Sequence, residues 1–112
     1  MEIHAKQVGN VTVVKPLEER LDASLAGNFK QQMSQIINQG NQLIVVSLDR
    51  VQFIDSTGLG AIVSSLKMLG REGDMVLCGT QEGVQSLFRL TRMDQVFQIY
   101  GNENDAVAAL SN

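Results

Sequence analysis

The sequence has few of the residues that metal and redox sites require. It contains one cysteine, one histidine, one proline and no tryptophan. A single cysteine allows no internal disulfide. Cys78 and His4, far apart in the chain, cannot by themselves form a zinc site. We therefore expect no metal site and no cofactor, and we interpret Cys78, in the apolar run MVLC, as a buried thiol of the core.

Basic clusters, aromatic residues and long apolar runs are also scarce. The 9 lysines and arginines are scattered along the chain and face 12 acidic residues. They form no tract that could follow a phosphate backbone, and 4 phenylalanines with 1 tyrosine offer no stacking platform for bases. No apolar run reaches the length of a membrane span, and no signal segment opens the chain. These absences argue against nucleic-acid and membrane partners and predict a soluble, cytoplasmic protein.

Short strand patterns recur along the 112 residues, which we expect to form one domain, residues 1–112. The first two strands enclose a Gly9-Asn10 turn, a pair that is typical of a tight hairpin. LIVVSL and MVLC are almost continuous in apolar residues, which indicates strands buried on both faces. The predicted strands are residues 2–8, 11–17, 43–48, 75–78 and 96–100.

Apolar residues at helical spacing predict four helices between and after these strands. Asp22, Thr80 and Asn102 stand where N-cap residues belong, and Gly40 and Gly70 stand where the first two helices should end. The apolar stripes are Leu21, Leu25, Phe29, Met33, Ile36 and Ile37; Leu59, Ile62, Val63, Leu66 and Leu69; Val84, Leu87 and Phe88; and Val107 with Leu110.

The resulting order, β-β-α-β-α-β-α-β-α, predicts an α/β fold. We expect a mixed, mostly parallel sheet of about five strands, opened by an antiparallel hairpin and covered by about four helices. Functional sites in such folds gather where parallel strands end and helices begin. The segment FIDSTGLG, residues 53–60, lies at such a point.

This segment places Asp55, Ser56, Thr57, Gly58 and Gly60 together at the start of the second helix. Aspartate, serine and threonine are preferred N-cap residues, so the simplest interpretation is a helix cap. A cap does not require three polar residues in a row, nor two glycines that each cost roughly 0.5–1 kcal/mol against alanine in a helix. The glycines indicate that something approaches the backbone closely.

Two interpretations in which the segment acts on a substrate lack their partner residues. A nucleophilic serine needs a base, but the motif G-x-S-x-G is missing and His4 has no evident orienting carboxylate. A phosphate cradle would use G-x-x-x-x-G-K-[ST], which is also missing, and Asp55 would repel an anion. We therefore expect no enzyme, and weak nucleotide binding remains an alternative.

A further interpretation is that the segment itself receives a phosphate. A phosphoserine at a helix N-terminus meets free N–H groups and the positive end of the helix dipole. It would add about −1.5 to −2 charges at neutral pH and, together with Asp55, repel a partner suited to the neutral form. The residues alone do not choose between Ser56 and Thr57 as the acceptor.

FIDSTGLG resembles the phosphorylation motif of anti-sigma factor antagonists, single-domain members of the STAS family (sulfate transporter and anti-sigma factor antagonist). The resemblance runs over essentially the whole chain. It includes RLDAS at 20–24, LIVVSLDRVQFIDSTGLG at 43–60, MVLCG at 75–79 and VFQIY at 96–100. The run Asp-Ser-Thr-Gly-Leu after an apolar strand is its most specific part.

The resemblance implies a partner switch. The unphosphorylated antagonist binds an anti-sigma factor that is also a serine kinase, and the kinase then phosphorylates the hydroxyl residue directly after the aspartate, here Ser56. A metal-dependent serine phosphatase resets the switch. The partner-binding residues implied for this chain are Asp22, Asp55, Ser56, Thr57, Gly58, Leu59 and Gly60.

The chain also departs from the family at one loop. Glu18 and Glu19 stand where many members carry a small glycine-containing turn. Because this loop borders the implied binding face, the partner can differ, and a STAS regulatory module for another signalling target is the second alternative.

Overall fold

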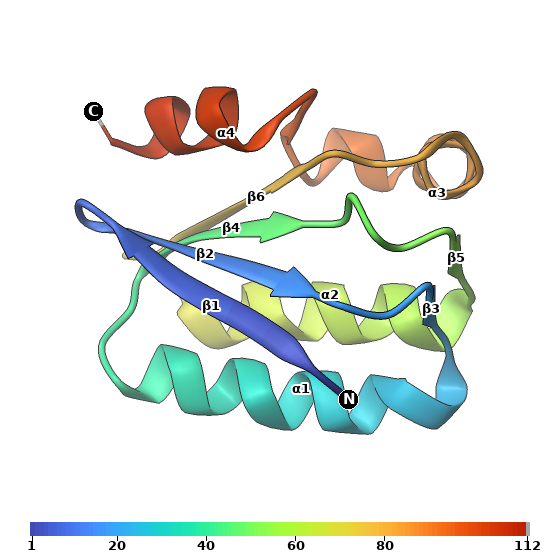
Figure 1. The fold of residues 1–112 in the computed structure, drawn as a ribbon, viewed down its shortest axis with the longest axis horizontal. Helices are drawn as coiled ribbons and strands as arrows, with labels where there is room; N and C mark the ends of the chain where they lie inside the picture. Colours follow the sequence, from blue (N-terminus) through green and yellow to red (C-terminus); the bar gives the residue numbers. More distant parts are fainter. Residues whose placement is uncertain (112) are drawn as a thin grey trace.

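The computed structural model describes residues 1–111, in which a five-stranded sheet carries helices on both faces (Figure 1). The strands lie in the order β1-β2-β4-β6-β7. β1 and β2 pair antiparallel, and the remaining pairs are parallel, so the predicted mixed sheet with an N-terminal hairpin is confirmed. The strands span Ile3–Val8 (β1), Val11–Pro16 (β2), Leu43–Ser47 (β4), Asp74–Cys78 (β6) and Ile99–Tyr100 (β7).

Helices α1 (Ala23–Asn38) and α2 (Ser56–Leu69) lie side by side on one face of the sheet (Figure 1). Their apolar stripes bury Phe29, Met33 and Ile62 completely, which confirms the helical spacing. Helix α4 (Glu103–Leu110) covers the other face, and α3 (Glu82–Leu90) lies near β5 at the end of the sheet.

Strand β4 shows why its sequence is apolar at nearly every position. Ile44 and Val46 belong to the core beneath α1 and α2, whereas Val45 belongs to the core beneath α4. All three are fully buried because successive side chains of a strand point to opposite faces. Cys78, at the end of the neighbouring β6, is 1% exposed and packs in the second of these cores, as predicted.

Two short strands were not predicted. β3 (Arg20–Leu21) and β5 (Phe53–Ile54) pair in parallel as a separate two-stranded sheet. The backbone N–H groups of Gln52 and Phe53 both donate to the carbonyl of Glu19, at 2.7 and 3.1 Å. This pairing lies directly before both α1 and α2, so it sets the two helix starts next to each other.

Two predicted boundaries were wrong. Thr80 does not cap α3, because the helix begins one residue later with Gln81 at its N-cap and with no side-chain cap hydrogen bond among the described residues. The last strand is shorter than 96–100. Val96 follows the 3₁₀ turn Met93–Gln95 (η1), is 50% exposed and lies outside β7. The caps predicted at Asp22 and Asn102 are confirmed.

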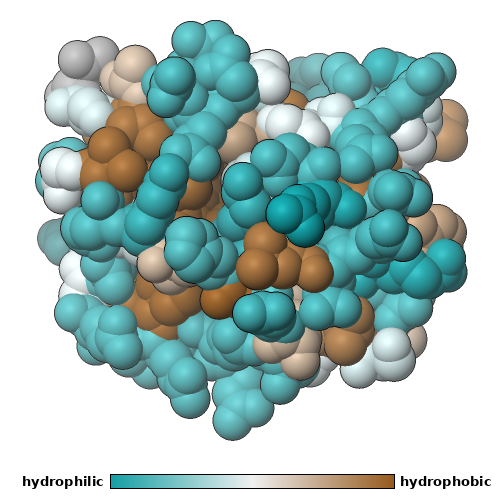
Figure 2. All heavy atoms as spheres, in the orientation of Figure 1, coloured by the Kyte–Doolittle hydropathy of each residue, from teal (hydrophilic) through white to brown (hydrophobic). Residues whose placement is uncertain are grey.

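The surface seen in Figure 2 is mostly hydrophilic, with separate apolar patches rather than a continuous band. Within residues 1–111, no helix combines the length and the apolar character that crossing a bilayer would need.

Candidate functional site

Asp55 directly follows β5 and is the N-cap of α2. Its backbone is extended, with φ −96° and ψ −178°, and its Oδ1 accepts a hydrogen bond from the N–H of Gly58 at 2.8 Å. The N–H of Leu59 donates to the carbonyl of Asp55 at 2.9 Å. The side chain of Asp55 therefore satisfies one N–H group that the start of α2 leaves free, and its carbonyl accepts the first regular hydrogen bond of the helix. The cap interpretation is correct for Asp55.

Ser56 and Thr57 occupy the first two positions of α2, and both are exposed. Within residues 1–111, neither hydroxyl and neither backbone N–H of this pair has a hydrogen-bond partner. Two accessible hydroxyls thus stand beside two free N–H donors at the positive end of the helix dipole. The geometry does not by itself favour one hydroxyl over the other.

Gly58 and Leu59 turn inward. Leu59 is 7% exposed and belongs to the core. A Cβ built on Gly58 would lie 2.0 Å from the carbonyl oxygen of Leu21 and 3.1 Å from Cγ2 of Ile54. Gly58 therefore allows α2 to pack on the backbone of β3. The close approach indicated by the glycines is, at Gly58, an approach of the chain to itself.

Gly60 has a different environment. It is exposed, and a Cβ there would meet no atom within 4 Å. It lines a groove between α1 and α2 of about 460 Å³. The other residues of this groove are small apart from one lysine: Ala23, Ala26, Gly27, Lys30, Thr57, Ala61 and Ser64. Of the two glycines, Gly60 is the one that leaves space for a partner.

Asp22 caps α1 on the neighbouring element. One of its oxygens, Oδ1, accepts from the hydroxyl of Ser24 at 2.6 Å and from the N–H of Ser24 at 3.1 Å. Its other oxygen lies 3.5 Å from Nε of Arg20. The hydrogen bond from the Ser24 hydroxyl, with smaller contributions from the Ser24 N–H and Arg20, lowers the pKa of the Asp22 carboxyl below its ordinary value.

The starts of the two helices are joined by Asp55. Its second oxygen, Oδ2, accepts from the N–H of Ala23, the first residue of α1, at 3.1 Å. The structure thus brings together Asp22 and Asp55, which lie 33 residues apart in the chain and were both predicted to belong to the site. Their connection through Ala23 could not be predicted, because backbone N–H groups have no signature in a sequence.

Sequence reasoning missed two further residues at this surface. Arg20 and Phe53 are cross-strand neighbours in the β3–β5 pair, and the guanidinium carbon of Arg20 lies 4.3 Å from the centroid of the Phe53 ring. Phe53 is 42% exposed although it is large and apolar. Arg20 also lines, with Glu18, Glu19 and Asp22, a hollow of about 440 Å³ beside α1. Only the unpredicted strand pairing would have revealed the stacked pair.

The described residues of the site include no paired base for Ser56 and no cluster of metal ligands. His4, the one histidine, lies on β1, and among residues 1–111 no hydrogen bond joins it to the Ser56 hydroxyl that begins α2. No group of three histidine, cysteine, aspartate or glutamate side chains within residues 1–111 could hold a metal ion. The arrangement leaves the hydroxyls of Ser56 and Thr57 exposed at the surface.

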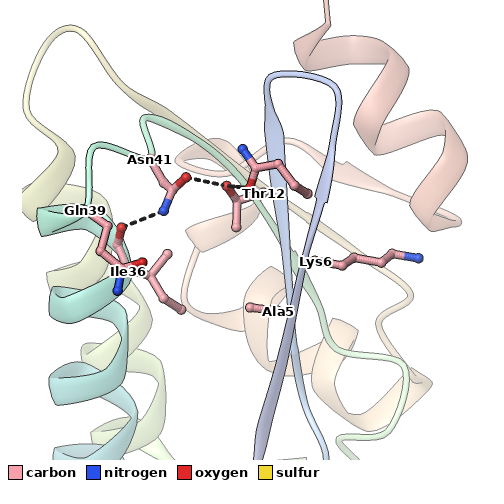
Figure 3. A pocket seen from close by; sticks show the side chains of 7 residues that line it. Ala5, Lys6, Thr12, Ile36, Gln39 and Asn41 are labelled. Carbon is pink, nitrogen blue, oxygen red and sulfur yellow. Dashed lines mark hydrogen bonds between the residues drawn. The ribbon is translucent and has the colours of Figure 1, made fainter.

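Another hollow, of about 200 Å³, lies between the β1–β2 hairpin and the C-terminal end of α1 (Figure 3). Its floor is a short polar chain in which the buried hydroxyl of Thr12 contacts Oε1 of Gln7 at 2.9 Å and Oδ1 of Asn41 at 3.0 Å. Nδ2 of Asn41 donates to the carbonyl of Ile36 at 2.8 Å. These contacts tie the hairpin to α1, and no candidate site residue lines this hollow.

The sequence signature of the STAS domain matches residues 2–106. The chain belongs to the STAS domain family. This STAS domain is 30% identical over 112 residues to the "Anti-sigma F factor antagonist" of Paenibacillus polymyxa, and the match covers 98% of the chain and 95% of that relative. The family resemblance stated from FIDSTGLG is thereby confirmed.

Solved structures give the same result for the fold. A candidate anti-sigma factor antagonist of Thermotoga maritima superposes with a TM-score of 0.90 at 28% identity, over 98% of this STAS domain and 95% of that chain. The antagonist SpoIIAA in its unphosphorylated form superposes with a TM-score of 0.80 at 20% identity, over 96% and 95% of the two chains. The phosphorylated SpoIIAA of Bacillus superposes with a TM-score of 0.72 at 19% identity, over 96% of this STAS domain and 98% of that chain. At 19% and 20% identity, the two SpoIIAA structures support a shared fold only.

Proposed function

We propose that this STAS domain is an anti-sigma factor antagonist controlled by phosphorylation of Ser56. The observation that carries the proposal is the exposed hydroxyl of Ser56 at the first position of α2, beside N–H groups that have no partner within residues 1–111. In its unphosphorylated form the domain binds an anti-sigma factor that is also a serine kinase, and the bound kinase releases its target. Phosphorylation of Ser56 ends this binding.

The physical basis of the switch is local charge. A phosphate on Ser56 adds about −1.5 to −2 charges next to the carboxylates of Asp55 and Asp22. The helix dipole and the free N–H groups stabilise the phosphate, so the domain keeps its fold. The partner, in contrast, meets an anion where it had packed against a neutral hydroxyl, and the cost of desolvating that anion weakens the complex.

The comparisons support this proposal through what the relatives are called. The Paenibacillus polymyxa relative, which matches over nearly the whole length, carries the name of an antagonist of an anti-sigma factor. SpoIIAA, which shares the fold, has been solved both with and without phosphate. These names describe regulators, and we infer that this domain likewise has no catalytic activity and no cofactor of its own.

The remaining components follow from the chemistry of the switch. Because the proposed kinase uses ATP, we propose that the domain works in the cytoplasm. A phosphoserine ester is stable without an enzyme, so a serine phosphatase, which we propose to be metal-dependent, must restore the hydroxyl. The predicted partner-binding residues Asp22, Asp55, Ser56, Thr57 and Gly60 reach the surface for these encounters, whereas Gly58 and Leu59 act by supporting the helix start from within.

Incubation with the cognate kinase and ATP, followed by mass spectrometry, tests the acceptor. We expect the wild type and Thr57→Ala to gain one phosphate and Ser56→Ala to gain none. Thr57→Ala is the matched control, since it removes the neighbouring exposed hydroxyl from the same helix turn. A phosphorylated Ser56→Ala protein together with an unmodified Thr57→Ala protein would move the site to Thr57, and an unmodified wild type would refute the proposal.

Binding measurements test the consequence of the charge. Ser56→Asp, which places a carboxylate at the first position of α2, should weaken binding to the kinase. Ser56→Ala should bind as well as the unphosphorylated wild type and stay bound in the presence of ATP. Equal affinities for the two variants would show that charge at position 56 does not control the complex.

A further inference from the structure

The Asp55 carboxylate lies between the first turns of two helices. Oδ1 accepts from Gly58 N–H in α2 at 2.8 Å, and Oδ2 accepts from Ala23 N–H in α1 at 3.1 Å. Both N–H groups belong to the positive ends of helix dipoles, where a carboxylate is stabilised. An N-cap that served α2 alone would need only one acceptor atom. The second hydrogen bond is therefore additional to capping.

Asp22 does not perform this task, although it lies at the same surface. Its Oδ1 accepts only from Ser24, two residues ahead in α1. The N–H of Leu25 and Ala26 donate to the backbone carbonyl of Asp22, at 3.0 and 2.9 Å. Asp22 thus serves its own helix, and within residues 1–111 Asp55 is the side chain that accepts from Ala23 N–H.

The segment held in this way lines two hollows of the surface, one of them together with Thr57. Residues 18–22 lead into Ala23, and all of them except the buried Leu21 line the hollow beside α1. Ala23 itself lines the groove between α1 and α2, together with Thr57. The bond from Ala23 to Asp55 sets the position of this segment relative to the residue that follows Asp55, which is Ser56.

We propose that Asp55 is a positioning residue for phosphorylation: by joining the starts of α1 and α2, it presents the surface residues of segment 18–23 and the Ser56 hydroxyl to the kinase as one surface. This inference rests on the proposed function of Ser56. The kinase then recognises a preorganised surface and does not have to order the α1 start on binding, which would cost affinity.

Asp55→Asn separates this role from simple capping. Asparagine is as good an N-cap as aspartate, and its single carbonyl oxygen can keep the bond from Gly58 N–H. Its amide nitrogen donates and cannot accept from Ala23 N–H. Glu72→Gln is the matched control for the lost charge, because Glu72 is exposed and lies beyond the opposite end of α2.

The first measurement needs no kinase. Amide hydrogen exchange by NMR, on folded protein, should show Ala23 N–H exchanging about 10-fold faster in Asp55→Asn than in the wild type, with Gly58 N–H nearly unchanged. Glu72→Gln should leave both amides at wild-type rates. An unchanged exchange rate of the Ala23 N–H would overturn the proposal. An equal increase in the exchange rate of the Gly58 N–H would also overturn it, because the substitution would then have disrupted the cap of α2 as a whole.

The second measurement uses the cognate kinase. Asp55→Asn should raise the KM for the protein substrate by about 10-fold and leave kcat within about twofold, because the loss lies in presentation and not in chemistry. Glu72→Gln should keep the wild-type KM. If Asp55→Asn keeps the wild-type KM although its Ala23 N–H exchanges faster, the proposal is overturned. A wild type that accepts no phosphate refutes the function of Ser56, and hydrogen exchange still decides whether Asp55 joins the helices.

Discussion

The carbonyl oxygen of Leu21 occupies the space that a side chain at position 58 would need. A Cβ on Gly58 would lie 2.0 Å from this oxygen, closer than real Cβ contacts come. The first turn of α2 therefore packs directly on the backbone of β3, and only glycine permits this distance. Because Leu21 precedes α1 and Gly58 lies in the first turn of α2, this contact and the Asp55 carboxylate hold the same two helix starts together.

We expect Gly58→Ala to destabilise the domain by about 2 kcal/mol or more, because the added methyl group must push the backbone of β3 away. The gain in helix propensity from alanine, roughly 1 kcal/mol, offsets only part of this cost. Urea unfolding followed by circular dichroism measures the change. Wild-type stability would show that β3 can move without cost.

Gly60→Ala is the matched control two residues further along the same helix. A Cβ at position 60 meets no atom within 4 Å, so the substitution should raise the free energy of unfolding by about 0.5–1 kcal/mol. The same methyl group projects into the groove lined by Thr57 and Lys30. We therefore expect weaker kinase binding from a more stable protein, and a variant that is destabilised would contradict the open space at this position.

The fold could be predicted because its main elements carry strong periodic patterns. Ile44, Val45 and Val46 are apolar in succession because β4 is covered on both faces, and Phe29 and Met33 are spaced for one face of a helix. β3 and β5 carry no such pattern, since each has only two residues. Their pairing depends on contacts between segments more than 30 residues apart, for which the sequence gives no local signal.

The candidate site could be predicted in its residue types but not in its connections. Aspartate before a helix is a known cap signal, which located Asp22 correctly; for α2 the sequence predicted a cap within Asp55-Ser56-Thr57, and the structure has it at Asp55. The two glycines of FIDSTGLG were interpreted alike, whereas the structure gives Gly58 an internal reason and leaves Gly60 on the surface. What separates them is the position of one carbonyl group of a distant strand, and sequence patterns do not report backbone positions.

Cys78 should be unreactive in the folded protein. Its side chain is buried, and this burial raises the pKa of the thiol above its ordinary value, which disfavours the reactive thiolate. We expect iodoacetamide at pH 8 to leave the native protein unmodified and to alkylate Cys78 fully in urea, as measured by mass spectrometry. Rapid alkylation without urea would instead identify an accessible, redox-competent thiol.

The pKa of Asp22 should rise toward that of an ordinary aspartate in Ser24→Ala, because the Ser24 hydroxyl is the main cause of its lowered value. A carboxyl whose pKa is lower in the folded than in the unfolded chain stabilises the fold above the unfolded value. This stabilisation is complete above about pH 4 and is lost as the pH falls through the folded value, so Ser24→Ala should reduce stability at neutral pH and have little effect in strong acid. NMR titration of the Asp22 carboxyl carbon in both proteins measures the shift, and identical midpoints would contradict the role of Ser24.

Phe53→Ala should weaken binding to the kinase by about 10-fold or more. Phe53 lies under the Arg20 guanidinium and two residues before Asp55, and exposed aromatic and arginine side chains are the commonest anchors of protein interfaces. Stability should change little, since the ring is 42% exposed. Met68→Ala provides the control, because Met68 is 39% exposed and lies near the opposite end of α2 from Ser56. Equal effects of the two substitutions on affinity would place the interface elsewhere than at the starts of α1 and α2.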